Sequence, residues 1–193
     1  MGAWAAGIAA QAAPTHLRAG AGSLPTSTHY IDGAPPGFSG GFDENACDAC
    51  HFEAAPNTAP GSIALTGIPD VFTPGASYDV TVTLDHAEAT RGGFQLTARL
   101  AETGAQAGTL EAGSGQDTRI KVERQSEIQY ASQRREGAVR SNDTFAWVLS
   151  WTAPDVPDGT VVQFHAAANA ADNDETAEGD FVFTTVVETR AGS

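Results

Sequence analysis

The only two cysteines of the chain, Cys47 and Cys50, lie three positions apart and are followed directly by His51. A Cys-x-x-Cys-His segment is the attachment signature of a c-type haem, because two thiols at this spacing can add to the two vinyl groups of one porphyrin. The histidine that follows is then placed to bind the iron from one face. The segment therefore predicts one covalent haem c per chain, with His51 as the proximal iron ligand.

Three other uses of such a segment fit the sequence less well. A structural zinc site commonly needs four ligands, and the chain has neither a second cysteine pair nor a spaced pair of histidines after the motif. A thioredoxin-like dithiol lies between a strand and a helix, whereas residues 40–45 and 52–56 have the composition of loops. A disulfide that closes so small a ring constrains the unfolded chain little. Haem attachment is favoured, and a disulfide, a redox dithiol and a metal site stay open as alternatives.

The second axial position of the iron needs a ligand from elsewhere. Met1 is the only methionine, so methionine ligation is not expected. His165 is the first choice, because it lies in a predicted strand and three alanines follow it, which leaves room for a macrocycle. His86, on a predicted loop, is the alternative. His29 and His16 could ligate the iron of a neighbouring subunit, and an open or water-bound iron is a further alternative.

The sequence after residue 60 has the alternation of apolar and polar residues that is typical of strands. Tyr78–Leu84 and Phe94–Leu100 alternate strictly, and Trp147, Leu149 and Trp151 share one face. Further strands are predicted at Ser62–Thr66, Ala107–Leu110, Arg119–Glu123, Ile128–Ala131, Val161–Ala166 and Phe181–Glu188. Eight or nine short strands separated by turn residues, without helical periodicity, predict an all-β protein with an antiparallel β-sandwich. We expect the haem at an edge or end of this sandwich, held mainly through residues 47–51.

The composition divides the chain into three parts. Residues 1–36 form an extended low-complexity arm, residues 37–59 form the haem-attachment loop, and residues 60–188 form the sandwich domain. Residues 1–13 resemble the end of a secretory signal that lacks its basic region. The arm is therefore either a signal remnant or a segment that binds a neighbouring copy.

The charge of the chain limits its partners. Lys and Arg number 10 and Asp and Glu number 24, which gives a formal net charge of −14 and argues against nucleic acid or an anionic membrane as a partner. The chain has no run of 18 apolar residues, so no membrane-spanning helix is expected. Two charged groups are interpreted as solvated. The first is an acidic stretch, which is interpreted as a solvated turn in preference to a calcium site and contains Asp172, Asp174, Glu175, Glu178 and Asp180. The second is a basic loop with Arg134, Arg135 and Arg140.

Several short tracts follow one another along residues 37–186. They are Gly37–Phe42, Pro60–Ile63, Thr73–Gly75 with Tyr78, Gly92–Leu96, Gln106–Gly108, Trp151–Pro154, Phe164–Asn169 and Gly179–Phe181. In this order they resemble bacterial Reeler-like domains, β-sandwiches named for the N-terminal domain of reelin, and more closely the subgroup with a Cys-x-x-Cys-His motif ahead of the sandwich. The resemblance implies a secreted or surface-exposed single-haem protein with an immunoglobulin-like sandwich. Relatives often carry a histidine in the strand corresponding to residues 129–132, but this sequence has none there.

The leading hypothesis is an extracellular or periplasmic monohaem c-type cytochrome that transfers electrons and is not an enzyme. Export is inferred because haem is usually attached covalently outside the cytoplasm. The expected partner is a redox protein or neighbouring copies of the chain, which would polymerise into a filament of stacked haems. The alternative is an extracellular adhesion or matrix-binding module in which the haem is a sensor or passenger. A haem enzyme needs an open iron position and a distal acid–base group, and no such group is recognisable in the sequence.

Overall fold

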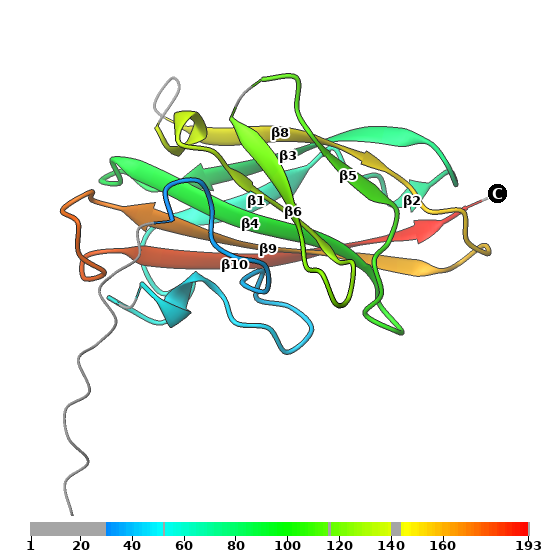
Figure 1. Ribbon diagram of the computed structural model, residues 1–193, viewed down its shortest axis with the longest axis horizontal. Helices are drawn as coiled ribbons and strands as arrows, with labels where there is room; N and C mark the ends of the chain where they lie inside the picture. Colours follow the sequence, from blue (N-terminus) through cyan, green and yellow to red (C-terminus); the bar gives the residue numbers. More distant parts are fainter. Residues whose placement is uncertain (1–29, 52, 116, 140–143, 193) are drawn as a thin grey trace, which may run out of the picture.

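The computed structural model describes residues 30–51, 53–115, 117–139 and 144–192, which fold into two facing β-sheets (Figure 1). The four-stranded sheet has the order β1 (Ser62–Thr66), β3 (Ser77–Asp85), β8 (Phe145–Thr152) and β5 (Thr109–Ala112). The six-stranded sheet has the order β2 (Val71–Phe72), β10 (Phe181–Ala191), β9 (Val161–Ala171), β4 (Arg91–Leu100), β7 (Gln129–Gln133) and β6 (Thr118–Val122). The two short 3-10 turns of the described residues are η1 (Cys47–Ala49) and η2 (Glu136–Ala138).

The strand pairing confirms the predicted all-β sandwich. Each recorded strand pair is antiparallel except β2 with β10, which run parallel through Val71 and Arg190. The two-residue strand β2 was not predicted, because it is too short for an alternating pattern to show. Strand β9 also extends beyond its predicted end, since Ala166–Ala170 is buried on both faces and therefore lacks alternation.

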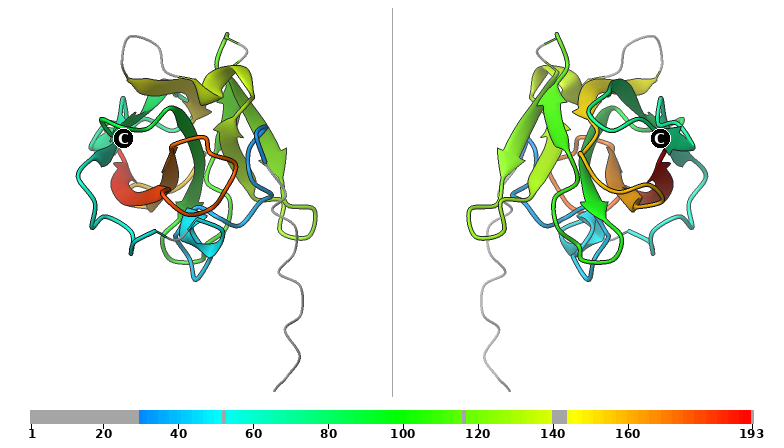
Figure 2. Two further views of the ribbon diagram at one scale, coloured as in Figure 1. Left: turned by 90° about the vertical axis from the view of Figure 1, so that its left-hand side faces the viewer. Right: turned by 90° about the vertical axis from the view of Figure 1, so that its right-hand side faces the viewer.

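The core lies between the sheets and is rich in aromatic side chains. In β8, Trp147, Leu149 and Trp151 are buried while Val148 is exposed, as the sequence predicts. The ring of Trp151 packs edge-on against Phe72 at 5.2 Å and Phe164 at 4.8 Å between centroids. Phe72 is a residue of β2, so the short parallel strand closes one side of the core around Trp151. End-on views show the two layers of the sandwich (Figure 2).

The outer face of the six-stranded sheet is covered by residues 30–46, which cross it in an irregular path (Figure 1). Lys121 in β6 donates hydrogen bonds to the carbonyl oxygens of Gly33 and Ala34. Gln95 in β4 donates to the carbonyl oxygen of Pro35 at 2.8 Å. The described part of the predicted arm, residues 30–36, thus packs on the sheet of its own chain, while residues 1–29 lie outside the described residues.

Candidate functional site

The motif lies on this same outer face, in a loop between the covering segment and β1. Cys47 begins η1, and Cys50 caps it through a backbone N–H that donates to the carbonyl oxygen of Cys47 at 3.1 Å. Both cysteines are unpaired thiols, with Cys50 exposed and Cys47 partly buried. Burial, together with the negative charge of Asp48, raises the pKa of the Cys47 thiol to about 12. One tight turn therefore presents two thiols three positions apart.

His51 is held by a buried carboxyl group. Its Nδ1 lies 2.5 Å from Oδ2 of Asp180, which is only 2% exposed and directly precedes β10. A carboxylate can only accept, so Nδ1 carries the hydrogen and donates it. Asn169 in β9 lies 3.2 Å from the same Nδ1 and donates to Asp180 Oδ2 at 3.4 Å. The other ring nitrogen, Nε2, has no hydrogen bond to the described residues and is therefore the one left to bind a metal ion.

A largely buried ion pair fixes the segment just ahead of the motif to the larger sheet. Arg99 in β4 donates to Glu44 and to the hydroxyl of Tyr130 in β7, and that hydroxyl donates to Glu44. The guanidinium of Arg99 also lies 5.0 Å from the ring centroid of Phe42. Burial, and next the hydrogen bond to Glu44, raise the pKa of Tyr130 above its ordinary value, so its hydroxyl stays protonated. This group fixes the loop to the sheet on the N-terminal side of the motif.

The C-terminal side of the motif is fixed to β10 and to the turn before it. Asn57 accepts a hydrogen bond from the backbone N–H of Thr184 at 2.9 Å and donates to the Thr184 carbonyl at 3.2 Å. Glu53 accepts from the backbone N–H of Gly179 at 3.1 Å. Contacts on both sides of the motif therefore fix the loop that carries residues 47–51 to the larger sheet.

His165, the first choice for a distal ligand, lies on the outer face of β9 under the covering segment. Its ring packs edge-on against Phe42 at 4.9 Å between centroids, and Nε2 lies 3.2 Å from the side-chain oxygen of Gln163. A side chain at Gly41 would come within 2.2 Å of the ring, so the backbone of Gly41 rests on it. Burial, and next the charge of Arg99, lower the pKa of His165. The neighbours of the His165 ring are therefore Phe42, Gln163 and Gly41, and none of them belongs to residues 47–51.

His86, the alternative, directly follows β3 and is buried at one end of the core. Its ring stacks on Phe181 at 5.1 Å and lies 6.1 Å from Phe183, measured between centroids. The other two predicted histidines, His16 and His29, lie outside the described residues. The distal ligand thus stays a prediction.

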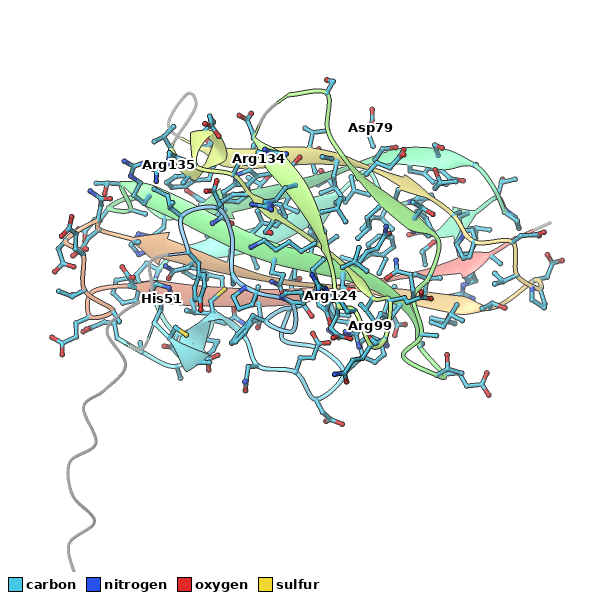
Figure 3. The ribbon with its side chains drawn as sticks, viewed as in Figure 1. His51, Asp79, Arg99, Arg124, Arg134 and Arg135 are labelled. Atoms are coloured by element: carbon cyan, nitrogen blue, oxygen red, sulfur yellow. The ribbon has the colours of Figure 1, made fainter. Side chains whose placement is uncertain are left out.

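The interpretation of the acidic stretch as wholly solvated is wrong at one position. Asp172, Asp174, Glu175 and Glu178 are exposed in the turn between β9 and β10, whereas Asp180 is buried. The sequence signal that could have separated Asp180 is its place immediately before Phe181, where β10 begins. In the predicted basic loop, Arg134 and Arg135 are exposed and lie away from His51, and Arg140 is outside the described residues (Figure 3).

The residues of the motif are chemically compatible with a covalently attached haem. The two free thiols share one turn, and the histidine beside them keeps one unengaged ring nitrogen. Within the described ranges, no group of three or more His, Cys, Asp or Glu residues is arranged to hold a metal ion. An open hollow of about 380 Å³ adjoins the turn, between Ala49 and Thr184 of β10.

In the part of the chain that the structure describes, no helix is long and apolar enough to span a membrane.

Comparison with known proteins supports the fold and is silent on the motif. No protein-family model and no curated protein matches the chain. Among solved structures, the Reelin-N domain of F-spondin is 19% identical with a TM-score of 0.50, over 76% of this chain and 95% of that one. A fragment of the human F-spondin reeler domain is 17% identical with a TM-score of 0.47, over 72% of this chain and 93% of that one. A cohesin module from Clostridium perfringens is 9% identical with a TM-score of 0.44, over 68% of this chain and 96% of that one. The chain therefore has a Reeler-like β-sandwich fold.

Proposed function

We propose that the chain is an exported c-type cytochrome with a single haem, built on a Reeler-like sandwich and used for electron transfer. The observation that carries the proposal is the motif together with the 2.5 Å contact between His51 and the buried Asp180. When bound, the haem supplies one-electron exchange between ferric and ferrous iron. Cys47 and Cys50 form the thioether bonds, and Nε2 of His51 binds the iron. The sandwich supplies a rigid support for this loop, and no enzymatic step is assigned to it.

The location proposed is extracellular or periplasmic, because haem is usually attached to such motifs after export. His165 is proposed as the distal ligand, with His86 as the alternative and His29 or His16 of a neighbouring copy as the intermolecular one. In the intermolecular case the chain polymerises and places haems of successive copies close together. The alternative partner is a separate redox protein.

The first experiment measures covalent haem. The chain is produced in a bacterium with c-type haem maturation and a working export signal, and denaturing gels are stained for haem. The expected result is one haem per chain by mass, lost in the Cys47→Ala, Cys50→Ala double variant. Absence of covalent haem in the parent protein contradicts the proposal. A low-spin spectrum that becomes high-spin in His165→Ala or in His86→Ala identifies the distal ligand.

The sandwich itself favours a second function, a module for adhesion or matrix binding in which the haem is a sensor or passenger. The observation behind it is the likeness to the Reelin-N domain of F-spondin, which concerns the sandwich. The two functions differ in redox behaviour. A fast, reversible one-electron response at an electrode supports electron transfer, and a high-spin ferric spectrum with a slow or absent response supports the binding module.

A further inference from the structure

Asp180 differs from every other carboxyl group in the turn between β9 and β10 because it faces inward. Its side chain is 3% exposed, and its two oxygens are both engaged. Oδ1 accepts a hydrogen bond from the backbone N–H of Asp172 at 3.3 Å. Oδ2 accepts one from Nδ1 of His51 at 2.5 Å and one from the side-chain amide of Asn169 at 3.4 Å. The carboxyl group therefore has a fixed direction relative to the imidazole ring.

The elements on either side of this contact make it rigid. Asn169 belongs to β9 and Asp180 directly precedes β10, and these two strands pair antiparallel from Phe181 with Ala170 onward. The contact to His51 joins positions that are 129 residues apart in the chain. The hairpin of β9 and β10 thus holds the ring of a residue whose own segment is an irregular loop.

A carboxylate on Nδ1 of a metal-binding imidazole has two physical effects. It fixes the tautomer and the orientation of the ring, and it makes the opposite nitrogen a more basic ligand. A more basic ligand, with a negative charge close behind it, stabilises the more positive oxidation state of the metal. The reduction potential of an iron bound through that nitrogen is therefore lowered.

We propose that Asp180 is a positioning residue for His51, which directs Nε2 to the haem iron and keeps the reduction potential low. This inference rests on the proposed haem function and adds to it the residue that tunes the iron. Asn169 assists by donating to the same carboxyl oxygen and by flanking the ring.

The test compares midpoint potentials of haem-loaded variants by spectroelectrochemical titration. Asp180→Asn keeps the size of the side chain and removes its acidic group, and the matched control is Asp174→Asn, an exposed carboxyl of the same turn that bonds only within it. The expected result is a higher midpoint potential for Asp180→Asn than for Asp174→Asn. Asp180→Glu, which restores the carboxyl group, should lie closer to the parent protein. Equal potentials in Asp180→Asn and Asp174→Asn overturn the inference.

Haem content separates this inference from the proposed function. Parent protein without covalent haem refutes the function, whereas loaded variants with unchanged potentials refute only the role of Asp180. Where Asp180 variants fail to fold, the parent haem protein is labelled with 15N-histidine instead. The Nδ1 proton of His51 should then be visible and slow to exchange with solvent, and a fast-exchanging or absent Nδ1 proton overturns the inference.

Discussion

At the scale of single residues, the two thiols of the motif differ in their surroundings. Burial and the charge of Asp48 raise the pKa of Cys47 to about 12, whereas Cys50 is exposed. Because the thiolate is the reactive form, we expect iodoacetamide at pH 8 to modify Cys50 at least about tenfold faster than Cys47 in the haem-free protein. Mass spectrometry of the two positions over time measures the ratio. The rates should converge in concentrated urea, and equal rates in the folded protein contradict the expectation.

His165 gives a second prediction at this scale. Burial, and next Arg99, lower its pKa below the ordinary value of 6.5, so the unfolded chain binds the proton more readily than the folded one. The stability that follows from the neutral ring is fully present above pH 6.5 and is lost as the pH falls through the lowered pKa. In the haem-free protein, His165→Gln should therefore lose less stability than the parent between pH 7 and about pH 5. Urea midpoints at several pH values measure this, and identical slopes for the two proteins refute it.

The sequence predicted the chemistry of the motif but not the group that orients it. Cys47, Cys50 and His51 are neighbours in the chain, so their spacing is visible directly. Asp180 is 129 positions away from His51 and lies at the end of a stretch of exposed carboxyl groups. Only the pairing of β9 with β10 shows that this one carboxyl group faces inward, and a single sequence does not reveal strand register of that kind.

At the scale of elements, the loop that carries the motif depends on a salt bridge whose partners are nearly buried. The side chains of Arg99 and Glu44 are 9% and 15% exposed. Replacing Arg99 by Met leaves the largely buried Glu44 without its cation, so we expect a loss of unfolding free energy of about 3 kcal/mol. Chemical denaturation measures this loss. The matched control is Arg124→Met on the exposed turn after β6, which should change stability by less than about 0.5 kcal/mol.

The local consequence of Arg99→Met follows from the same contacts. Glu44 also accepts a hydrogen bond from Ser39 at 2.9 Å, so its displacement releases residues 38–46 from the sheet. Backbone amides of this segment should then exchange with deuterium faster, while those of β9 and β10 stay protected. Unchanged exchange in residues 38–46 would mean that Phe42 and Gly41, packed on His165, hold the segment without the ion pair.

At the scale of the whole molecule, the pattern of the strands was predictable and the path of the covering segment was not. Alternation of apolar and polar residues marks most strands, because the apolar side chains of one face pack in the core and the other face carries polar side chains. Residues 30–46 have no such period, since they are held by isolated contacts such as Lys121 with Gly33 and Gln95 with Pro35. Contacts of this kind depend on side chains of distant strands and leave no periodic trace in the segment itself.

The net charge of −14 gives the last prediction, which concerns encounter with redox partners. The exposed carboxyl groups near His51 include Asp48, Glu53, Asp172 and Glu178. The electrostatic potential near His51 is therefore negative, like the net charge of the chain. Raising the ionic strength from about 10 mM to about 1 M shortens the screening length from about 30 Å to about 3 Å. Oxidation of the ferrous protein by the cation hexaammineruthenium(III) should therefore slow about tenfold or more, and oxidation by the anion hexacyanoferrate(III) should accelerate.

Stopped-flow absorbance of the haem measures both rates, with an uncharged quinone as the control that should show little change. The opposite signs for the two ions separate an electrostatic effect from a salt effect on the protein, because a change in folding or in haem exposure would move both rates in one direction. Rates that change in the same direction for cation and anion contradict steering by the field. Opposite changes mean that the negative charge of the protein favours cationic partners over anionic ones.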